Sequence, residues 1–353
     1  MTFRVGLIGV GSIAQAHLRD YYQTRPPEAE LVACADPDAG ARERFSARCG
    51  LPAYADPAEL LRRSDVDAVD ICTPPESHPR LITAAAEAGK HALCEKPLGT
   101  DYAQAASAVA AAERAGVQVG VNHNYRWRAE YAHARDVLAS GRLGKPFMAS
   151  LRALLHWHGG VPYRRAARRM LMIEQTIHYV DLLRFLLGAN VTRVYAVAGK
   201  PARQATVGET YAALILNFAN GAIGNIVNSG EAQGARVSWG GETIVQAEEG
   251  TIYLNRRNLY TFEMYSPGSG GLSEITFPSE LYSASTNQTF DRPLRAFFSA
   301  LDAGRDVPVS AADNLNTLAA VLAAYESTET NQVIDVSAFV QRQAAGAPQP
   351  LLA

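Results

Sequence analysis

The sequence predicts an α/β chain, with a doubly wound parallel sheet in its N-terminal part and an α+β domain with a large open, mainly antiparallel sheet in the rest. Its 353 residues, at about 150 residues per domain, correspond to roughly two domains. In the first third, short apolar runs alternate with alanine-rich helical segments, as in a parallel sheet covered by helices. Between residues 191 and 277, strand candidates follow one another without long helices, which favours an antiparallel sheet.

The first domain, residues 1–122, contains compact apolar runs that predict strands buried on both faces. These strands are Arg4–Ile8, Leu31–Ala35, Ala68–Cys72, Ala92–Cys94 and Val117–Val121. Good helix formers fill the gaps and predict the helices Ser12–Tyr22, Ala39–Arg48, Pro79–Ala88 and Tyr102–Ala115. Glycines stand where three of these helices are expected to stop, at Gly50, Gly89 and Gly116.

The second domain, residues 123–343, is predicted from its run of strands. They are Val194–Ala198, Tyr211–Phe218, Ala222–Asn228, Thr243–Ala247 and Thr251–Leu254. Asn220-Gly221 and Glu249-Gly250 are hairpin turn signals. Helices at Leu294–Asp302 and Asp313–Thr328 are expected to bring a C-terminal segment back near the first domain, and residues 344–353 form a loose tail.

Composition and charge exclude several classes of protein. Hydrophobic residues make up 48% and charged residues 19% of the chain, which is ordinary for a globular protein. The formal net charge is −2 and there is no long run of like charge, so neither nucleic acid nor an anionic membrane is an expected partner. No apolar stretch approaches the roughly 20 residues of a membrane span, and the N-terminus reads directly as a strand, so we expect a cytoplasmic protein with a small-molecule partner.

The cysteines and histidines give no metal signal, and no metal site is predicted. The four cysteines form no C-x-x-C pair and are expected to be reduced, mostly buried side chains. His156-Trp157-His158 places two histidines on one face of an extended segment, but acidic or cysteine ligands do not cluster with them.

A glycine motif directly after the first strand predicts a dinucleotide site. In Gly9-Val10-Gly11-Ser12-Ile13-Ala14, Gly9 permits the tight turn, Gly11 admits a pyrophosphate and Ala14 replaces the third glycine. The helix that starts at Ser12 and Ile13 supplies amide donors and a favourable dipole for the phosphates.

Asp36 favours NAD over NADP, because a carboxylate after the second strand accepts the ribose hydroxyls. NADP requires a cation for its 2′-phosphate, and Arg42 and Arg44 are the nearby candidates. The remaining alternative is a purely structural glycine turn.

Further motifs follow at the carboxyl ends of strands, where open α/β sheets place their ligands. They are Thr73-Pro74 with His78, Glu95-Lys96-Pro97, Asn124-Tyr125-Arg126, Gly141-Arg142-Leu143-Gly144 and Glu174-Gln175-Thr176-Ile177-His178-Tyr179-Val180-Asp181. In this ordered set the chain resembles the Gfo/Idh/MocA family (glucose-fructose oxidoreductase, inositol dehydrogenase and rhizopine catabolism proteins) over nearly its whole length. The resemblance implies an N-terminal Rossmann domain, a C-terminal domain for substrate binding and oligomerisation, and NAD(P)-dependent oxidation or reduction of a sugar or polyol.

The resemblance and the chemistry of hydride transfer together single out three catalytic candidates. Lys96 stabilises the oxyanion that develops as a carbonyl forms, and His178 exchanges the hydroxyl proton. Glu174 shares a helix face with His178 and Asp181. Many family members carry aspartate in place of Glu174, so its alternative role is substrate binding only. Asp181 is expected to be a structural partner or substrate contact.

The remaining site predictions are divided between cofactor and substrate. Those for the cofactor are Gly9, Gly11, Ser12, Ile13, Asp36, Thr73, Pro74, His78, Glu95 and Lys96. Those for the substrate are Lys96, Asn122, Arg126, Trp157, Glu174 and His178, with a surface role as the alternative for Asn122 and Arg126. Trp157 or Tyr163 is suited to stack on a sugar ring, and Arg164, Arg165, Arg168 and Arg169 are either a solvated face or a phosphate site.

Two other functions stay open at this point, together with a prediction of self-association. Some proteins of the family use bound NAD for redox-neutral glycoside cleavage, and others are non-catalytic NAD(P)-binding regulators. Lys96 and His178 suit a glycosidase as well as a dehydrogenase, but they argue against a regulator. The large sheet of the second domain predicts a homo-oligomer, a dimer or a tetramer.

Overall fold

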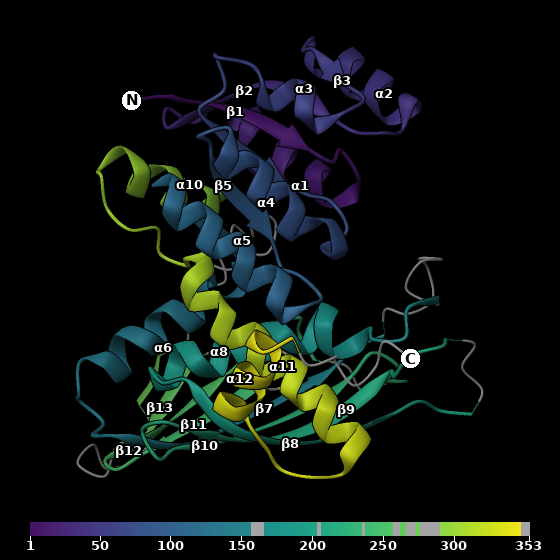
Figure 1. The fold of residues 1–353 in the computed structure, drawn as a ribbon. Coiled ribbons are helices and arrows are strands. Elements are labelled where there is room, and N and C mark those ends of the chain that lie inside the picture. Colours follow the sequence, from purple (N-terminus) through teal and green to yellow (C-terminus); the bar gives the residue numbers. More distant parts are fainter. Residues whose placement is uncertain are drawn as a thin grey trace. The chain divides into compact units, whose positions relative to one another are not determined.

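The computed structural model describes residues 1–156, 166–202, 206–234, 237–256, 262–265, 273–275 and 290–346. The chain divides into two compact units, the first formed by residues 1–124 and 286–315 and the second by residues 125–285 and 316–353 (Figure 1). The domains expected from the sequence, 1–122 and 123–343 with a C-terminal segment back near the first domain, stay predictions. The roles of the two domains stay predictions.

The first unit is built on a parallel sheet in the order β3-β2-β1-β4-β5-β6. Its strands are β1 (Phe3–Ile8), β2 (Ala29–Ala35), β3 (Ala53–Tyr54), β4 (Ala68–Ile71), β5 (His91–Glu95) and β6 (Val119–Asn122). Strand order reverses between β1 and β4, which marks the switch point where such sheets bind ligands. The predicted parallel sheet is confirmed, and β3 is a short strand that the apolar pattern did not predict.

Helices cover this sheet, and three of them begin at a residue whose side chain caps the helix. The helical elements are α1 (Ser12–Asp20), η1 (Tyr22–Thr24), α2 (Ala39–Cys49), α3 (Pro57–Leu61), η2 (Pro75–Ser77), α4 (His78–Glu87), α5 (Tyr102–Ala115) and α10 (Asp291–Asp302). Asp38, Asp56 and Asp101 cap α2, α3 and α5 with their side chains. The core includes Phe297 and Phe298 of α10, which explains why residues 286–315 group with the first unit.

The second unit carries a nine-stranded sheet within the described residues, in the order β14-β13-β12-β11-β7-β10-β9-β8-β15. Its strands are β7 (Pro146–Leu154), β8 (Val191–Gly199), β9 (Tyr211–Phe218), β10 (Ile223–Ser229), β11 (Glu242–Ala247), β12 (Gly250–Leu254), β13 (Phe262–Tyr265), β14 (Ser273–Ile275) and β15 (Ile334–Asp335). All neighbours are antiparallel except β7 and β10, which run parallel. The prediction of a mainly antiparallel sheet is therefore confirmed.

Helices cover one face of this sheet and leave apolar side chains on the other. The helical elements are η3 (Asn124–Trp127), α6 (Ala129–Ala139), the π-helical turn η4 (Met172–Thr176), α8 (Ile177–Leu187), α11 (Ala311–Thr330) and α12 (Val336–Ala344). In Figure 1, α6, α8 and α12 lie on the same side of the sheet. Side chains that point away from them are half exposed: Val197, Tyr211, Ile215, Ile223 and Val227.

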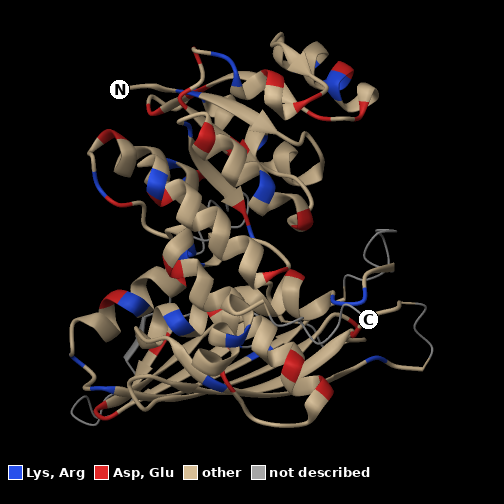
Figure 2. Cartoon of the chain, viewed as in Figure 1, with Lys and Arg blue, Asp and Glu red and all other residues tan. Residues whose placement is uncertain are grey.

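In the described residues of both units, Lys and Arg are interspersed with Asp and Glu along the ribbon (Figure 2). In the part of the chain that the structure describes, no helix is both long and apolar enough to cross a membrane. The cytoplasmic location stays a prediction.

Candidate functional site

The glycine motif forms the turn between β1 and α1 that the sequence predicts. Gly9 has a φ of +86°, and a Cβ there would lie 2.8 Å from Thr73 Cγ2 and 2.9 Å from the carbonyl oxygen of Cys72. Gly11 is the N-cap of α1 and no side chain caps this helix. A Cβ on Gly11 would meet no described atom within 4 Å. The amides at the start of α1, at Ser12 and Ile13, therefore have the open approach that a pyrophosphate requires.

Asp36 follows β2 and is joined to the glycine turn. Its Oδ2 accepts a hydrogen bond from the Val10 amide at 2.9 Å, and its Oδ1 accepts one from the Asp38 amide at 2.8 Å. Arg42 donates to the carbonyl oxygens of Asp36 and Pro37, at 2.8 and 2.9 Å. The contacts of Asp36 place a carboxylate beside the glycine turn, as the NAD prediction requires. Arg42 holds the backbone that follows β2.

His78 joins two loops at the carboxyl edge of the parallel sheet. Its Nδ1 lies 2.7 Å from the carbonyl oxygen of Pro97, and its Nε2 lies 2.8 Å from that of Thr73. The ring is fully buried at the start of α4, and this burial lowers the pKa of the imidazole. The geometry thus shows His78 holding the Thr73-Pro74 loop against Pro97, while a contact with the cofactor stays a prediction.

Lys96 directly follows β5, and the residue before it belongs to a buried hydrogen-bond network. His17 of α1 lies between two carboxylates: its Nδ1 is 2.8 Å from Asp70 Oδ2 and its Nε2 is 3.0 Å from Glu95 Oε1. Asn122, at the end of β6, donates to the same Glu95 oxygen at 2.7 Å. We call His17, Asp70, Glu95 and Asn122 the His17 network. All four are at most 5% exposed, so Glu95 and Asn122 already have partners inside the protein.

Charge within the His17 network sets its protonation. Burial opposes a charge on His17, but the charge and hydrogen bond of Asp70, together with the interactions of Cys72, raise the pKa of the imidazole well above its ordinary value. Burial also opposes ionisation of Glu95, yet the hydrogen bond and charge of His17, with the charge of Lys96, lower the pKa of that carboxyl. The adjacent Cys72 stays a thiol, because burial raises its pKa to about 12. The network therefore holds an imidazolium between two carboxylates.

In the second unit, Glu174 and His178 lie on either side of a change in helix type. Glu174 is half-buried within the π-helical turn η4, and His178 is buried in the first turn of α8. π-Helical turns often occur at functional sites. The ring of His178 stacks on Tyr125, with ring centroids 4.2 Å apart and an interplanar angle of 13°. The guanidinium of Arg128 lies 4.6 Å from the centre of the Tyr125 ring.

Asp181 forms a buried ion pair with Arg126. Arg126 donates from Nε and Nη2 to the two carboxylate oxygens, each at 2.6 Å. Thr317 also donates to Asp181, at 3.2 Å. This geometry gives Asp181 the structural-partner role that the sequence suggests. Two donor nitrogens of Arg126 are engaged by Asp181. The predicted contact of Arg126 with substrate therefore stays a proposal, in which the substrate binds beside the Arg126–Asp181 ion pair.

Several predicted residues lie outside the described part of the chain, and others have contacts that assign them no role in binding. Trp157, His158, Tyr163, Arg164 and Arg165 lie outside the described residues. His156 bridges to Glu231, and its Nδ1 lies 3.2 Å from Gln233 Nε2. Arg169 lies over the ring of Tyr325, with its guanidinium carbon 5.2 Å from the ring centroid. The phosphate hypothesis for the arginine cluster therefore stays a prediction.

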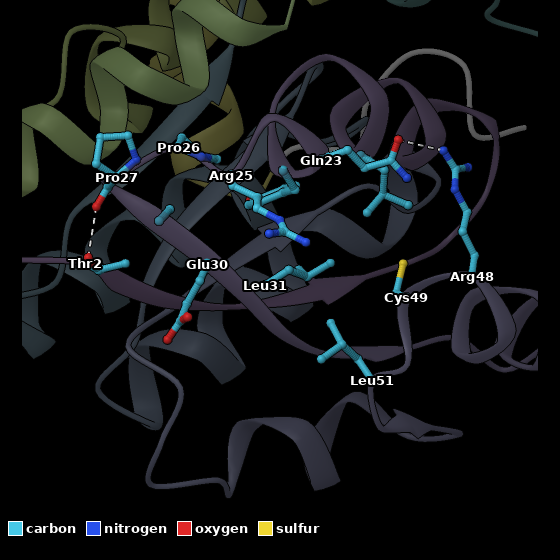
Figure 3. Close-up of a pocket in the computed structure, with 13 residues that line it drawn as sticks. Thr2, Gln23, Arg25, Pro26, Pro27, Glu30, Leu31, Arg48, Cys49 and Leu51 are labelled. Atoms are coloured by element: carbon cyan, nitrogen blue, oxygen red, sulfur yellow. Dashed lines mark hydrogen bonds between the residues drawn. The ribbon is translucent and has the colours of Figure 1, made fainter.

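A cavity of about 470 Å³ lies in the first unit, at the opposite end of β2 from Asp36 (Figure 3). Arg48 crosses its rim and donates to Gln23 at 2.9 Å. Leu31 and Leu51 also line the cavity. Because its lining includes the first residues of β2, the cavity is separate from the carboxyl edge of the sheet where the dinucleotide motif lies.

Two members of the His17 network, His17 and Asp70, are not marked by any motif in the sequence. Asp70 does leave a signal, because it interrupts an otherwise apolar strand that is predicted to be buried on both faces. A fully buried aspartate requires a partner. The partner, His17, is distant in sequence and only the fold brings it to Asp70.

Comparisons with known proteins agree with both units. Residues 3–123 match the family model described as "Oxidoreductase family, NAD-binding Rossmann fold", and residues 131–253 match the "GFO/IDH/MocA C-terminal domain". D-apiose dehydrogenase from Paraburkholderia graminis is 30% identical over 346 residues, covering 96% of this chain and 90% of that protein. Myo-inositol 2-dehydrogenase from Thermotoga maritima is 26% identical over 345 residues, covering 96% and 99%.

Similarity also extends to solved structures. An oxidoreductase from Agrobacterium radiobacter, solved in complex with NAD+, L-tartaric acid and magnesium, matches with a TM-score of 0.86 at 27% identity. The match covers 95% of this chain and 99% of that one.

Proposed function

Because the chain belongs to the Gfo/Idh/MocA family of NAD-binding oxidoreductases, we propose that it transfers a hydride between NAD and a secondary alcohol or ketone of a sugar, an inositol or a sugar derivative. Its relatives include sugar and inositol dehydrogenases. The observation that carries the proposal is the position of Lys96, directly after β5 and next to the anchored Glu95. Lys96 thus follows a strand at the carboxyl edge of the parallel sheet, where such folds bind nucleotides.

NAD is the proposed cofactor, and the residues of the first unit fit it. The glycine turn accommodates the pyrophosphate, while Thr73 and Pro74 follow the neighbouring strand. Asp36 supplies a carboxylate for the ribose hydroxyls, and its negative charge disfavours a 2′-phosphate.

Lys96 and His178 divide the proposed chemistry on the substrate. Oxidation of a secondary alcohol removes a hydride from carbon and a proton from oxygen, and bound NAD accepts the hydride. Lys96 stabilises the negative charge that develops on the oxygen, and His178 takes the proton. Glu174, in the adjoining π-helical turn, binds the substrate or orients His178. Reduction of a ketone uses the same groups in reverse.

A spectrophotometric screen of sugars, inositols and sugar acids with NAD and NADP tests the function directly. We expect NADH to accumulate with at least one of these substrates. Lys96→Met is expected to abolish turnover and leave NAD binding intact, because the methionine keeps the length of the side chain without the charge. Lys90→Met is a matched control in the same unit, since Lys90 donates to the carbonyl oxygen of Arg63. Equal activity of wild type and Lys96→Met contradicts the mechanism.

The same screen separates the two other functions open to the family. Release of free sugar from a glycoside with catalytic NAD and no accumulating NADH establishes redox-neutral cleavage. Binding of NAD without turnover of any substrate favours a regulator. Either result overturns the dehydrogenase proposal while leaving the fold and the dinucleotide site in place.

The preference for NAD over NADP is tested at Asp36. We expect wild-type protein to bind NADH more tightly than NADPH, and Asp36→Ser to narrow the difference because it removes the charge that opposes a 2′-phosphate. Binding is measured by fluorescence titration of both reduced cofactors. Tighter binding of NADPH by the wild type contradicts the assignment.

We propose that the half-exposed apolar face of the nine-stranded sheet binds a second copy of this chain. Ile215 and Val227 lie on adjacent strands of this face, and each is nearly half exposed. Contiguous apolar surface of this kind marks an interface. Light scattering is expected to give a dimer or tetramer, and Ile215→Lys or Val227→Lys to reduce the mass. Val333→Lys, at an exposed position between α11 and β15, is the control, and a monomeric wild type contradicts the proposal.

A further inference from the structure

The imidazole of His17 is the central group of the His17 network, and it connects helix α1 with strands β4 and β5 of the first unit. It comes from α1, the helix that begins at the glycine turn. It faces Asp70 of β4 and Glu95 of β5 at 2.8 and 3.0 Å. The ring of Phe290, just before α10, lies 4.8 Å away between centroids and closes the remaining side.

Neutral side chains also donate hydrogen bonds to the two carboxylates of the His17 network. Tyr22 donates to Asp70 Oδ2 at 3.1 Å, and Asn122 donates to Glu95 Oε1 at 2.7 Å. The Cys72 thiol also donates to Asp70 Oδ1, at 3.6 Å, so each carboxylate has at least one neutral donor in addition to His17. Among the described hydrogen bonds, His17 is the one side chain that contacts both carboxylates, and it adds a side-chain connection between the paired strands β4 and β5.

A bound cation is a competing explanation for three of these groups. Ligand atoms of His17, Asp70 and Cys72 all lie within 4.8 Å of one another. However, His17 Nδ1 lies 2.8 Å from Asp70 and 3.5 Å from Cys72 Sγ, which are hydrogen-bond distances. Its other nitrogen is engaged by Glu95. The distances therefore describe a closed hydrogen-bond network.

We propose that His17 is a positioning residue for Lys96: by joining Asp70 to Glu95, it fixes the end of β5 and so the first residue after that strand. The proposal rests on the proposed function of Lys96. Lys96 is adjacent to Glu95 in the chain, and the Glu95 carboxylate is the only part of that residue that His17 contacts among the described hydrogen bonds. A shift of the carboxylate therefore moves the backbone from which Lys96 extends. Misplacement by about 1 Å lowers a rate by about 10²-fold.

Two substitutions divide the two contacts of His17. In His17→Gln the amide nitrogen takes the place of Nε2 and keeps the donor to Glu95, whereas in His17→Asn it takes the place of Nδ1 and keeps the donor to Asp70. Both replace the imidazolium with a neutral amide of the same chemistry. The two variants therefore differ chiefly in which of the two carboxylates keeps its hydrogen bond to residue 17.

We expect kcat of His17→Asn to fall about 10²-fold below wild type and His17→Gln to retain clearly more activity, with KM and NAD affinity similar in both. Thermal unfolding of the two variants controls for loss of folded protein. If kcat falls equally in both, or only in proportion to the folded fraction, His17 has a structural role and the proposal is overturned.

A second measurement does not depend on turnover. The chain has four lysines, Lys90, Lys96, Lys145 and Lys200, so ¹⁵N-lysine labelling yields few amide signals, and Lys96→Met identifies the one from Lys96. In the NAD-bound protein, His17→Asn is expected to shift the Lys96 amide more than His17→Gln does, with Lys145 and Lys200 unmoved. An unmoved Lys96 signal in both variants overturns the proposal. Absence of any sugar or polyol substrate, with the Lys96 signal shifted, overturns only the proposed function.

Discussion

The two units hold their histidines in different ways. His17 in the first unit is fixed through both ring nitrogens by the carboxylates of Asp70 and Glu95. His178 in the second unit is fixed through its ring face, which stacks on Tyr125 at 4.2 Å. Stacking sets the plane of an imidazole, whereas carboxylates at both nitrogens hold a proton on each of them. The stacked ring of His178 suits proton exchange, whereas the two carboxylates beside His17 stabilise a positive charge on that ring.

The two units also differ in the partners of their buried carboxylates. In the first unit the buried acids surround a histidine, while in the second unit Asp181 is engaged by Arg126 through two hydrogen bonds of 2.6 Å. Arginine keeps its charge at any physiological pH, but a histidine keeps its charge only where its surroundings raise its pKa. Buried carboxylates therefore form a fixed ion pair with an arginine in the second unit and a titratable network with a histidine in the first.

The largest expected effect concerns His178. We expect His178→Gln to lower kcat by about 10²- to 10⁴-fold, the usual contribution of a general acid–base group, because the amide does not exchange protons. His133→Gln is the control in the same unit, since His133 packs edge-on against Phe262. Steady-state kinetics on the substrate found by the screen measure both. A His178→Gln variant with wild-type kcat removes the functional contrast between the two histidines.

Removal of the Asp181 carboxylate tests the fixed ion pair. Asp181→Ala is expected to lower the free energy of unfolding by about 3 to 5 kcal/mol, because it leaves a largely buried guanidinium without this carboxylate. Asp181→Asn retains an acceptor and is expected to cost less. Denaturant unfolding measures both variants. A loss below about 1 kcal/mol for Asp181→Ala means that the pair behaves as an exposed one.

Two adjacent tyrosines provide a matched pair for the network. Tyr22→Phe removes a hydrogen bond to the Asp70 carboxylate and is expected to cost about 1.5 to 3 kcal/mol of unfolding free energy. Tyr21→Phe is expected to be neutral or stabilising, since the buried Tyr21 hydroxyl has no hydrogen-bond partner among the described residues and its removal removes a desolvation cost. Equal losses in the two variants, measured by urea unfolding, contradict the importance of the Asp70 contact.

The smallest expected effect is a change in the pH dependence of stability. The folded-state pKa of His17 is raised, so its stabilising contribution is complete below the ordinary histidine value of about 6.5 and is lost as the pH rises through the folded-state pKa. We therefore expect the difference in unfolding free energy between wild type and His17→Gln to shrink at alkaline pH. Urea unfolding between neutral and alkaline pH measures this difference. A difference that grows with pH contradicts a protonated His17.

The local sequence pattern was sufficient to predict the bounds of elements whose conformation depends mainly on their own residues. Tyr102–Ala115 and Tyr211–Phe218 have the same bounds in the structure as in the prediction, because a run of good helix formers and a short apolar run followed by a turn signal each favour one conformation. β7 was not predicted, although it alternates. It pairs in parallel with β10 and antiparallel to β11, and such long-range pairing leaves no local signal.

The predicted site shows the same limit. The motif around Gly9 and the residue Lys96 are found from their places after strands, because strand ends are local features. The spacing of Glu174 and His178 predicts that they share one helix face, but Glu174 lies in the π-helical turn η4 and not in a regular α-helix. Helix type there depends on packing, which spacing alone does not reveal.

By itself, the sequence determined the α/β class, the parallel and mainly antiparallel sheets, the dinucleotide turn and the family, because these follow from local periodicity and from motifs at strand ends. Tertiary structure alone decided which buried charges meet. His17 and Asp70 are 53 residues apart and His17 and Glu95 are 78 apart, and Arg126 reaches Asp181 across 55. A buried charge requires a partner, but only the folded chain determines which one it has.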